Sequence, residues 1–153
     1  MFFLIIFYLF TVVVVSAISI GAIVIGLLPA SMTVIRLALM CGFFGALGGA
    51  LYCVRAVYVN RSARNEWKTQ WHCWYFLRPL ASVICGGLSL LFLKAGLLVL
   101  DAGTKAGASH LGYYAFAFIA GFNVDKFLGK VEDIAQTTWG IEKSRLRASD
   151  ESK

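Results

Sequence analysis

The side chains best suited to bind a ligand lie in one basic and aromatic stretch. They combine arginine and lysine with tryptophan, and the set consists of Arg61, Arg64, Trp67, Lys68, Trp71 and Arg78. On a helix, Trp67, Trp71 and Trp74 share one face, and Arg61, Arg64 and Lys68 share an adjacent face. Guanidinium and indole groups together bind phosphates and stacked bases, so the pattern predicts an anionic ligand, a nucleotide or a single-stranded oligonucleotide.

The same spacing is also typical of an amphipathic helix that lies among lipid headgroups. In such a helix the aromatic rings occupy the membrane interface and the cations point toward phosphate. The spacing alone does not separate this membrane-surface interpretation from a ligand site, and both stay open.

A second set of charges lies in or beside apolar segments, where charge is expensive and by default indicates function. It consists of Arg36, Lys94, Asp101 and Lys105. Arg36 and Lys94 are each close to an end of an apolar segment, so their charged groups can extend to water. If they instead point inward, the four side chains form a polar vestibule on the outer side, as charged rings do in pores.

Motifs for catalysis and for metal binding are missing. The cysteines have no C-x-x-C spacing, and they are Cys41, Cys53, Cys73 and Cys85. The sequence contains no H-E-x-x-H, no G-x-S-x-G and no glycine-rich phosphate loop. We therefore expect no catalytic residues, no metal site, no disulfide and no cofactor.

Composition indicates which elements hold these side chains. Hydrophobic residues make up 59% of the 153 residues, and charged residues make up only 14%. Ordinary soluble domains contain about 45–50% apolar and about 25% charged residues. So few charges cannot cover a soluble surface, which excludes a soluble globular enzyme and a disordered chain. The sequence therefore predicts an all-α membrane protein.

Three segments have the roughly 20 apolar residues that a spanning helix needs. Ser31 is expected to cap the second of these helices, and Pro79 to lie in the first turn of the third. The predicted spans are residues 2–28, 32–54 and 79–100, in a region 1–100 that also holds a basic and aromatic segment at 55–78.

The region 101–122 is predicted to hold an outer loop and a short fourth transmembrane helix. The apolar run 111–122 makes only about 18 Å of helix, less than the thickness of the hydrocarbon. It spans if residues 106–110 extend it or other helices shield it, and a re-entrant segment is the alternative. We favour the short span, for a reason that comes from charge.

Lysine and arginine are concentrated at 55–78 and after residue 122, whereas only Lys105 lies between the third and fourth apolar segments. Basic loops of inner-membrane proteins face the cytoplasm. We therefore expect a bacterial inner-membrane protein with four crossings and both termini in the cytoplasm.

The region 123–138 is predicted to form a cytoplasmic amphipathic helix. Asn123 is in the position of an N-cap, and Asp125 lies near the positive end of the helix dipole. The apolar face consists of Val124, Phe127, Leu128, Val131 and Ile134. We expect this helix to lie on the membrane or against a neighbouring subunit, followed by a mobile charged tail at 139–153.

Small residues occur at spacings that let membrane helices pack closely. The predicted packing residues are Gly42, Gly45, Gly49, Gly86, Gly87 and Gly121. Three helices with such faces offer more packing surface than a lone four-helix bundle uses, so we predict a homo-oligomer. The alternative is that one bundle satisfies all of these faces. The first span, 2–28, has large side chains and is expected to be the most exposed to lipid.

Three stretches resemble a known family. They are Trp71-His-Cys-Trp-Tyr-Phe-Leu-Arg-Pro-Leu80, Gly86-Gly87 and Tyr114-Ala-Phe-Ala-Phe-Ile-Ala-Gly-Phe122. In these stretches the chain resembles small bacterial multi-pass membrane proteins, some of which are membrane effectors of anti-phage defence, such as the Hailong type. The resemblance implies a channel that is controlled by a nucleotide or an oligonucleotide.

Two functions from different classes follow. The first is a homo-oligomeric ion-conducting pore, a membrane-depolarising defence effector that a nucleotide or oligonucleotide controls at the basic cytoplasmic face. The alternative is a non-conducting membrane anchor or accessory subunit that docks a soluble partner protein. The lipid bilayer and further copies of the chain are the other expected partners.

Overall fold

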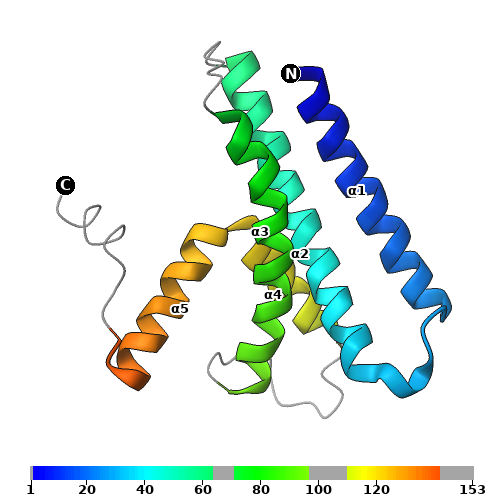
Figure 1. Cartoon of the computed structure of the whole chain (residues 1–153), viewed down its shortest axis with the longest axis vertical. Helices are drawn as coiled ribbons and strands as arrows, with labels where there is room; N and C mark the ends of the chain where they lie inside the picture. The colour runs from blue at the N-terminus through cyan, green and yellow to red at the C-terminus, as the bar shows by residue number, and fades with distance from the viewer. Residues whose placement is uncertain (1, 64–70, 97–109, 142–153) are drawn as a thin grey trace.

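The computed structural model describes residues 2–63, 71–96 and 110–141, and the elements in these ranges are all helical (Figure 1). The helices are α1 (Phe2–Ile25), α2 (Thr33–Tyr58), α3 (His72–Lys94), α4 (Leu111–Phe122) and α5 (Val124–Trp139). A short 3-10 turn (Ala30–Met32) precedes α2, and a π-helical turn (Val59–Ala63) continues it.

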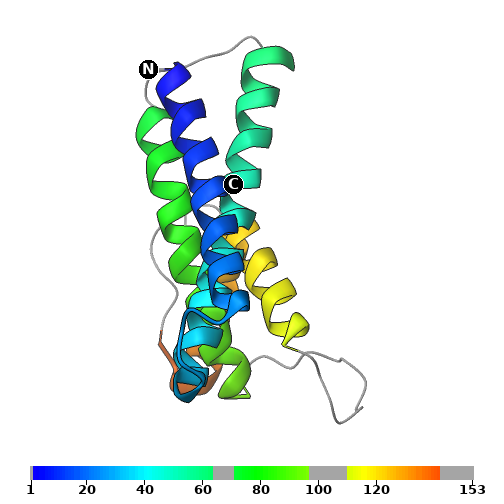
Figure 2. The same ribbon diagram turned by 90° about the vertical axis from the view of Figure 1, so that its right-hand side faces the viewer.

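Three helices in the described ranges are long and apolar enough to cross a membrane. They cover Phe2–Ile25, Thr33–Arg61 and His72–Lys94. Figures 1 and 2 show α1, α2 and α3 running along the long axis of the molecule. This arrangement agrees with the helical membrane protein that the composition predicts.

Two helix starts differ from the sequence prediction. α3 begins at His72 rather than at Pro79, so Pro79 lies inside the helix, where its missing N–H removes a backbone hydrogen bond. Pro79 is almost fully buried. The predicted cap is also wrong, because Ser31 lies in the 3-10 turn and Met32 holds the N-cap position of α2. The described parts of 55–78 therefore continue α2 and begin α3, and they are not a separate surface helix.

The backbones of α2, α3 and α4 meet at three glycines. A Cβ added to Gly45 would lie 2.8 Å from Cα of Gly86, and a Cβ added to Gly121 would lie 2.6 Å from Cα of Gly45. Real Cβ atoms do not approach other atoms so closely, so only glycine fits at these three positions. In lipid, where apolar burial alone drives little association, such close approach supplies the packing that holds helices together.

The remaining predicted glycines differ in their surroundings. Gly49 lies against the Ser82 side chain, whereas Gly42 makes an ordinary contact, with a built Cβ 3.6 Å from Cγ1 of Val83. A Cβ on Gly87 would meet open space, so Gly87 takes no part in this packing. Gly48 belongs to the contact as well, since its Cβ would lie 2.8 Å from the backbone nitrogen of Phe122.

A buried hydroxyl group adds a polar link at the same contact. Ser82 Oγ lies 2.8 Å from the carbonyl oxygen of Arg78 in its own helix and 2.8 Å from that of Gly121 in α4. Its proton therefore bonds to one or both of these acceptors, which ties the end of α4 to α3.

α1 lies at the edge of the bundle. In the most apolar 18-residue stretch of each long helix, only 17% is buried in α1, against 50% in the helix Thr33–Arg61 and 39% in α3. Ile5 and Leu9 pack with Cys53 and Tyr75, and Tyr8 donates a hydrogen bond to the carbonyl of Phe76 at 3.2 Å. The first helix is thus the most exposed of the three, as its large side chains predict.

α4 runs beside α2 but ends before α2 does. Cys41 Sγ lies 3.9 Å from the Tyr113 carbonyl near the start of α4, and the ring of Phe122 lies 5.5 Å from that of Tyr52 at its end. α2 and its continuation extend beyond Tyr52 to Ala63. The 12 residues of α4 therefore cover only part of the height of the bundle.

The chain reverses direction between α4 and α5. The turn is at Asn123, whose backbone angles are φ −117° and ψ 53°. The rings of Phe116 and Phe127 lie 6.3 Å apart, whereas eleven residues of continuous helix would separate them by about 16 Å. Figures 1 and 2 show α5 returning toward the end of the bundle where α4 begins. We call this pair of helices, Leu111–Trp139, the α4–α5 hairpin.

Replacing Gly45 tests the glycine contact. We expect Gly45→Ala to lower the free energy of unfolding by about 2–3 kcal/mol, because its methyl group would enter the backbone of α3. Gly87→Ala is the matched control in a neighbouring helix, and we expect a change within about 0.5 kcal/mol. Unfolding in a denaturing detergent titration, followed by circular dichroism, measures both. Equal stability of the two variants would contradict the contact.

Candidate functional site

Arg78 lies inside the bundle rather than at its surface. Its side chain is only 5% exposed, although Arg78 is one of the cations that the sequence predicts to face an anionic ligand. Its guanidinium carbon lies 4.7 Å from the ring centre of Tyr52 and 5.4 Å from that of Trp74. The delocalised cation is therefore held between α2 and α3 by aromatic faces.

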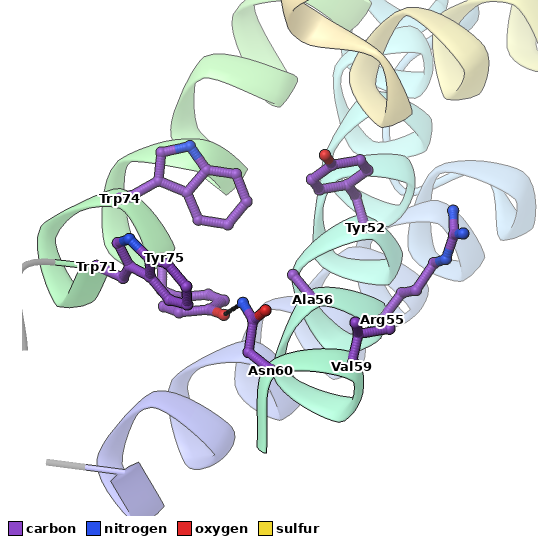
Figure 3. A pocket seen from close by; sticks show the side chains of 8 residues that line it. All are labelled: Tyr52, Arg55, Ala56, Val59, Asn60, Trp71, Trp74 and Tyr75. Atoms are coloured by element: carbon purple, nitrogen blue, oxygen red, sulfur yellow. Dashed lines mark hydrogen bonds between the residues drawn. The ribbon is translucent and has the colours of Figure 1, made fainter. Parts of the chain in front are cut away.

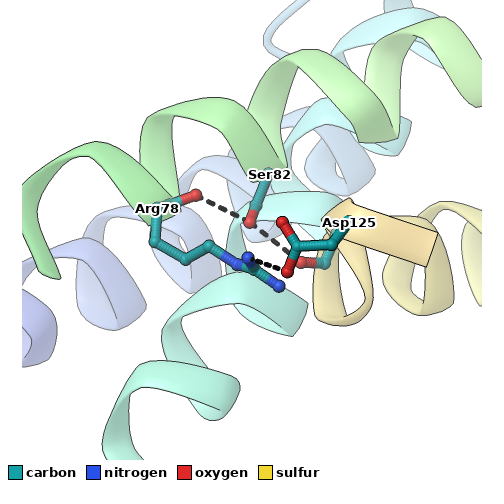
Figure 4. Close-up of polar contacts among 4 residues, drawn as sticks. Arg78, Ser82 and Asp125 are labelled. Carbon is teal, nitrogen blue, oxygen red and sulfur yellow. Dashed lines mark hydrogen bonds and ion pairs between the residues drawn. The ribbon is translucent and has the colours of Figure 1, made fainter. Parts of the chain in front are cut away.

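The counter-ion of Arg78 comes from the α4–α5 hairpin. Nη1 of Arg78 lies 2.6 Å from Oδ2 of Asp125, in the first turn of α5 (Figure 4). The Asp125 side chain is 77% exposed, so the pair has one buried and one open member. Nε of Arg78 is also buried and has no hydrogen-bond partner among the described residues.

This ion pair connects the tip of the hairpin to α3. A buried arginine without a carboxylate would carry a large desolvation penalty, so Asp125 stabilises the charge as well as the position of α5. The placement of Asp125 near the positive end of its helix agrees with the prediction. Its partner was not predicted, because the two residues lie 47 positions apart.

A pocket of about 440 Å³ lies between the end of α2 and the start of α3 (Figure 3). Asn60 Nδ2 donates a hydrogen bond to Tyr75 Oη at 3.2 Å across one side of it. Tyr52 and Trp74, which hold Arg78, also line this pocket. We call it the aromatic pocket, and its lining residues are Tyr52, Arg55, Ala56, Val59, Asn60, Trp71, Trp74 and Tyr75.

The three described members of the predicted anion-binding set lie in different surroundings. Trp71 lines the aromatic pocket, whereas the Arg61 guanidinium lies 5.6 Å from the ring centre of Phe2 in α1, and Arg78 is buried in its ion pair. The other predicted members, Arg64, Trp67 and Lys68, lie outside the described residues.

The predicted set missed the α2 side of the pocket. Arg55 and Asn60 fall beyond residue 54, where the second span is predicted to end, and Tyr52 falls inside that span, where the sequence marks it only as an apolar residue. Continuing the helical period through Arg55 would have placed Tyr52, Arg55 and Val59 on one face. The missed signal was thus the length of α2, not an unusual residue type.

The predicted vestibule is described only in part. Arg36 donates a hydrogen bond from Nη2 to the carbonyl of Ile23 at 2.9 Å, near the end of α1. Lys94 is exposed at the last residue of α3, and Asp101 and Lys105 lie outside the described residues. Arg36 therefore joins α1 to α2, which is a structural role.

The surface of α5 has two distinct faces. Val124 and Phe127 are buried against the bundle, and Asp125, Lys126 and Lys130 are exposed. α5 returns alongside the lower part of α3, so it lies at the same height as helices of spanning length (Figure 1).

The described residues form a helical bundle with three helices of membrane-spanning length, the α4–α5 hairpin and the buried Arg78. No protein-family model matches the sequence, and no curated protein and no solved structure matches it either. Within the described ranges, no three His, Cys, Asp or Glu side chains come together where they could hold a metal ion. The function of the chain must therefore follow from its own residues and their geometry.

A double-mutant cycle measures the ion pair. We expect Arg78→Met and Asp125→Asn to show a coupling energy of about 2 kcal/mol, between the values typical of exposed and of fully buried pairs. Glu132→Gln, which removes another carboxylate of α5, is the control partner, and its coupling to Arg78→Met should be near zero. Unfolding free energies in detergent supply the four values of each cycle. A coupling to Glu132 as large as that to Asp125 would refute the assignment.

Proposed function

We propose that the chain is the subunit of a homo-oligomeric, ion-conducting membrane pore. In this proposal the α4–α5 hairpin is re-entrant, and the charged face of α5 lines a water-filled path between subunits. The observation that carries the proposal is the exposed polar face of α5 beside helices of spanning length.

The argument depends on what can cover that face. Lipid cannot solvate Asp125, Lys126 and Lys130, because charge within hydrocarbon is strongly disfavoured. Irregular or polar backbone at membrane depth is tolerated only where it is buried in protein or borders water. Other subunits around a hydrated axis satisfy both conditions, and charged rings of this kind line known pores.

The glycines support the oligomer less than their spacing predicts. Gly45, Gly86 and Gly121 meet each other within one chain, so they are not available to a neighbouring subunit. These contacts correspond to the alternative in which one bundle satisfies the small-residue faces without a second copy of the chain. The case for further copies therefore rests on α5, whose polar face is exposed in the part of the chain that the structure describes.

The proposed topology has three crossings rather than four. The basic end of the bundle, with Arg55 and Arg61, would face the cytoplasm of a bacterial inner membrane. The start of α1 lies at this end, and the end of α5 lies at the opposite one (Figure 1). The two ends of the described chain would then lie on different sides of the membrane. Dissipation of the membrane potential would fit a defence effector, a role that rests on the sequence resemblance.

Ion flux tests the pore directly. We expect liposomes that contain only this protein to conduct ions, since no other subunit is part of the proposal. The double variant Lys126→Gln, Lys130→Gln should raise cation over anion permeability severalfold, because it removes two positive charges from the pore lining. Arg61→Gln, which removes an exposed cation at the opposite end of the bundle, is the control and should leave that ratio unchanged. A cross-linked oligomer without flux would instead support the non-conducting anchor.

Thiol labelling tests the proposed topology. In a background with Cys73→Ser, we expect Arg61→Cys and Ile141→Cys to react with a membrane-impermeant maleimide from opposite sides. Both positions are exposed in the structure. Labelling of both from the same side would show that an even number of helices crosses, as in the four-span prediction.

A further inference from the structure

A groove of about 380 Å³ lies between α1 and α2. Its lining residues are Ile6, Leu9, Phe10 and Val13 of α1 and Val54, Val57 and Tyr58 of α2. We propose that this groove binds an acyl chain of an anionic phospholipid, with the lipid phosphate at Arg61. The proposal requires a membrane but no conducting pore, so it stands apart from the function proposed above.

The groove has a buried floor and an open, apolar rim. Leu9 is only 2% exposed, whereas Phe10 is 65% and Tyr58 is 66% exposed. The helices on both sides are long and apolar enough to cross a membrane, so the rim lies beside hydrocarbon in a bilayer. Apart from the Tyr58 hydroxyl group, the lining offers no polar group to a ligand. A hydrocarbon chain fits such a groove, because it needs no hydrogen bonds and gains many dispersion contacts.

A cation stands beyond one end of the groove. Val54, Val57 and Tyr58 have the spacing of one helix face, and the next position of that spacing is Arg61. The π-helical turn Val59–Ala63 shifts this phase, so the side on which Arg61 lies must come from a contact. Its guanidinium carbon lies 5.6 Å from the ring centre of Phe2, in the first turn of α1. Arg61 therefore faces the same helix that forms the other wall of the groove.

The depth and the charge of this end favour a phosphate group. The helix of spanning length, Thr33–Arg61, ends at this arginine, which places the cation near the level of lipid headgroups. A guanidinium packs on an aromatic ring by its face and binds phosphate at its N–H edge, so Arg61 can make both contacts. All acidic residues that the structure describes belong to α5, whereas the groove lies between α1 and α2. Basic sites between helices on the cytoplasmic side of a membrane bind anionic headgroups in this way.

Lipid retention by the full chain tests the selectivity. The protein is reconstituted into vesicles of equal parts phosphatidylglycerol and phosphatidylcholine with the same acyl chains, extracted in mild detergent, and analysed with its bound lipids by native mass spectrometry. We expect phosphatidylglycerol to be enriched about fivefold over phosphatidylcholine, since one arginine near the membrane surface contributes about that factor. Equal retention of the two lipids, or retention of neither, would overturn the proposal.

Variants of cations locate the headgroup. Arg61→Gln should abolish the enrichment, whereas Arg61→Lys should keep most of it because the charge remains. Lys94→Gln removes an exposed cation at the opposite end of the bundle and should leave the enrichment unchanged. Enrichment that survives in Arg61→Gln would overturn the position of the phosphate. Because Arg61→Gln leaves the charged face of α5 intact, lipid selectivity and ion selectivity can fail separately.

A bulkier side chain tests whether the acyl chain lies in the groove. Val54 lines the groove and is 47% exposed, so Val54→Trp fills the space without entering the core. We expect this variant to lower the retention of both lipids severalfold. Ile84→Trp, at a 56% exposed apolar position of α3, is the matched control and should change neither. Unchanged retention in Val54→Trp would contradict the location.

A second copy of the chain is the competing occupant, because an apolar helix also fills an apolar groove. In that case Val54→Trp would lower the oligomeric mass, and lipid retention would not depend on Arg61. This result would overturn the proposal in favour of a contact between chains. We expect the reverse, with lipid lost from Val54→Trp and the oligomeric mass unchanged.

Discussion

The close contact of Gly45, Gly86 and Gly121 is the constraint on which the rest of the structure depends. Inside a bilayer, apolar side chains gain little by leaving lipid for protein, so helices associate where their backbones can approach. This one contact joins α2, α3 and α4 and brings the end of α4 to the level of Tyr52. α4 has only 12 residues and ends partway along the bundle. The chain turns there, and α5 runs back toward the end of the bundle where α4 begins (Figure 1).

The position of that turn explains the buried arginine. Arg78 is enclosed by Tyr52 and Trp74, and among the described residues its carboxylate partner is Asp125, in the first turn of α5. The same two rings form walls of the aromatic pocket.

Much of this fold can be predicted from the sequence, and its limits have physical reasons. Hydropathy finds the three long helices, and glycine spacing finds the residues of the central contact, because both signals are local. The direction of α5 is not local: a helix that lies on the membrane and one that returns beside α3 have the same amphipathic pattern. The burial of Arg78 could not be predicted for a similar reason, since its counter-ion Asp125 lies far away in sequence. Pro79 was misleading because proline marks helix starts but is tolerated inside membrane helices.

The central claim is that α5 inserts beside the bundle and that its charged face meets other subunits. A cryo-EM map of the full chain in lipid nanodiscs tests this most directly. The account predicts a symmetric ring in which each Asp125 lies at the level of Arg78 within the bilayer and the Lys126 and Lys130 faces converge on the axis. A single chain per nanodisc, or α5 lying flat among the headgroups, would contradict it.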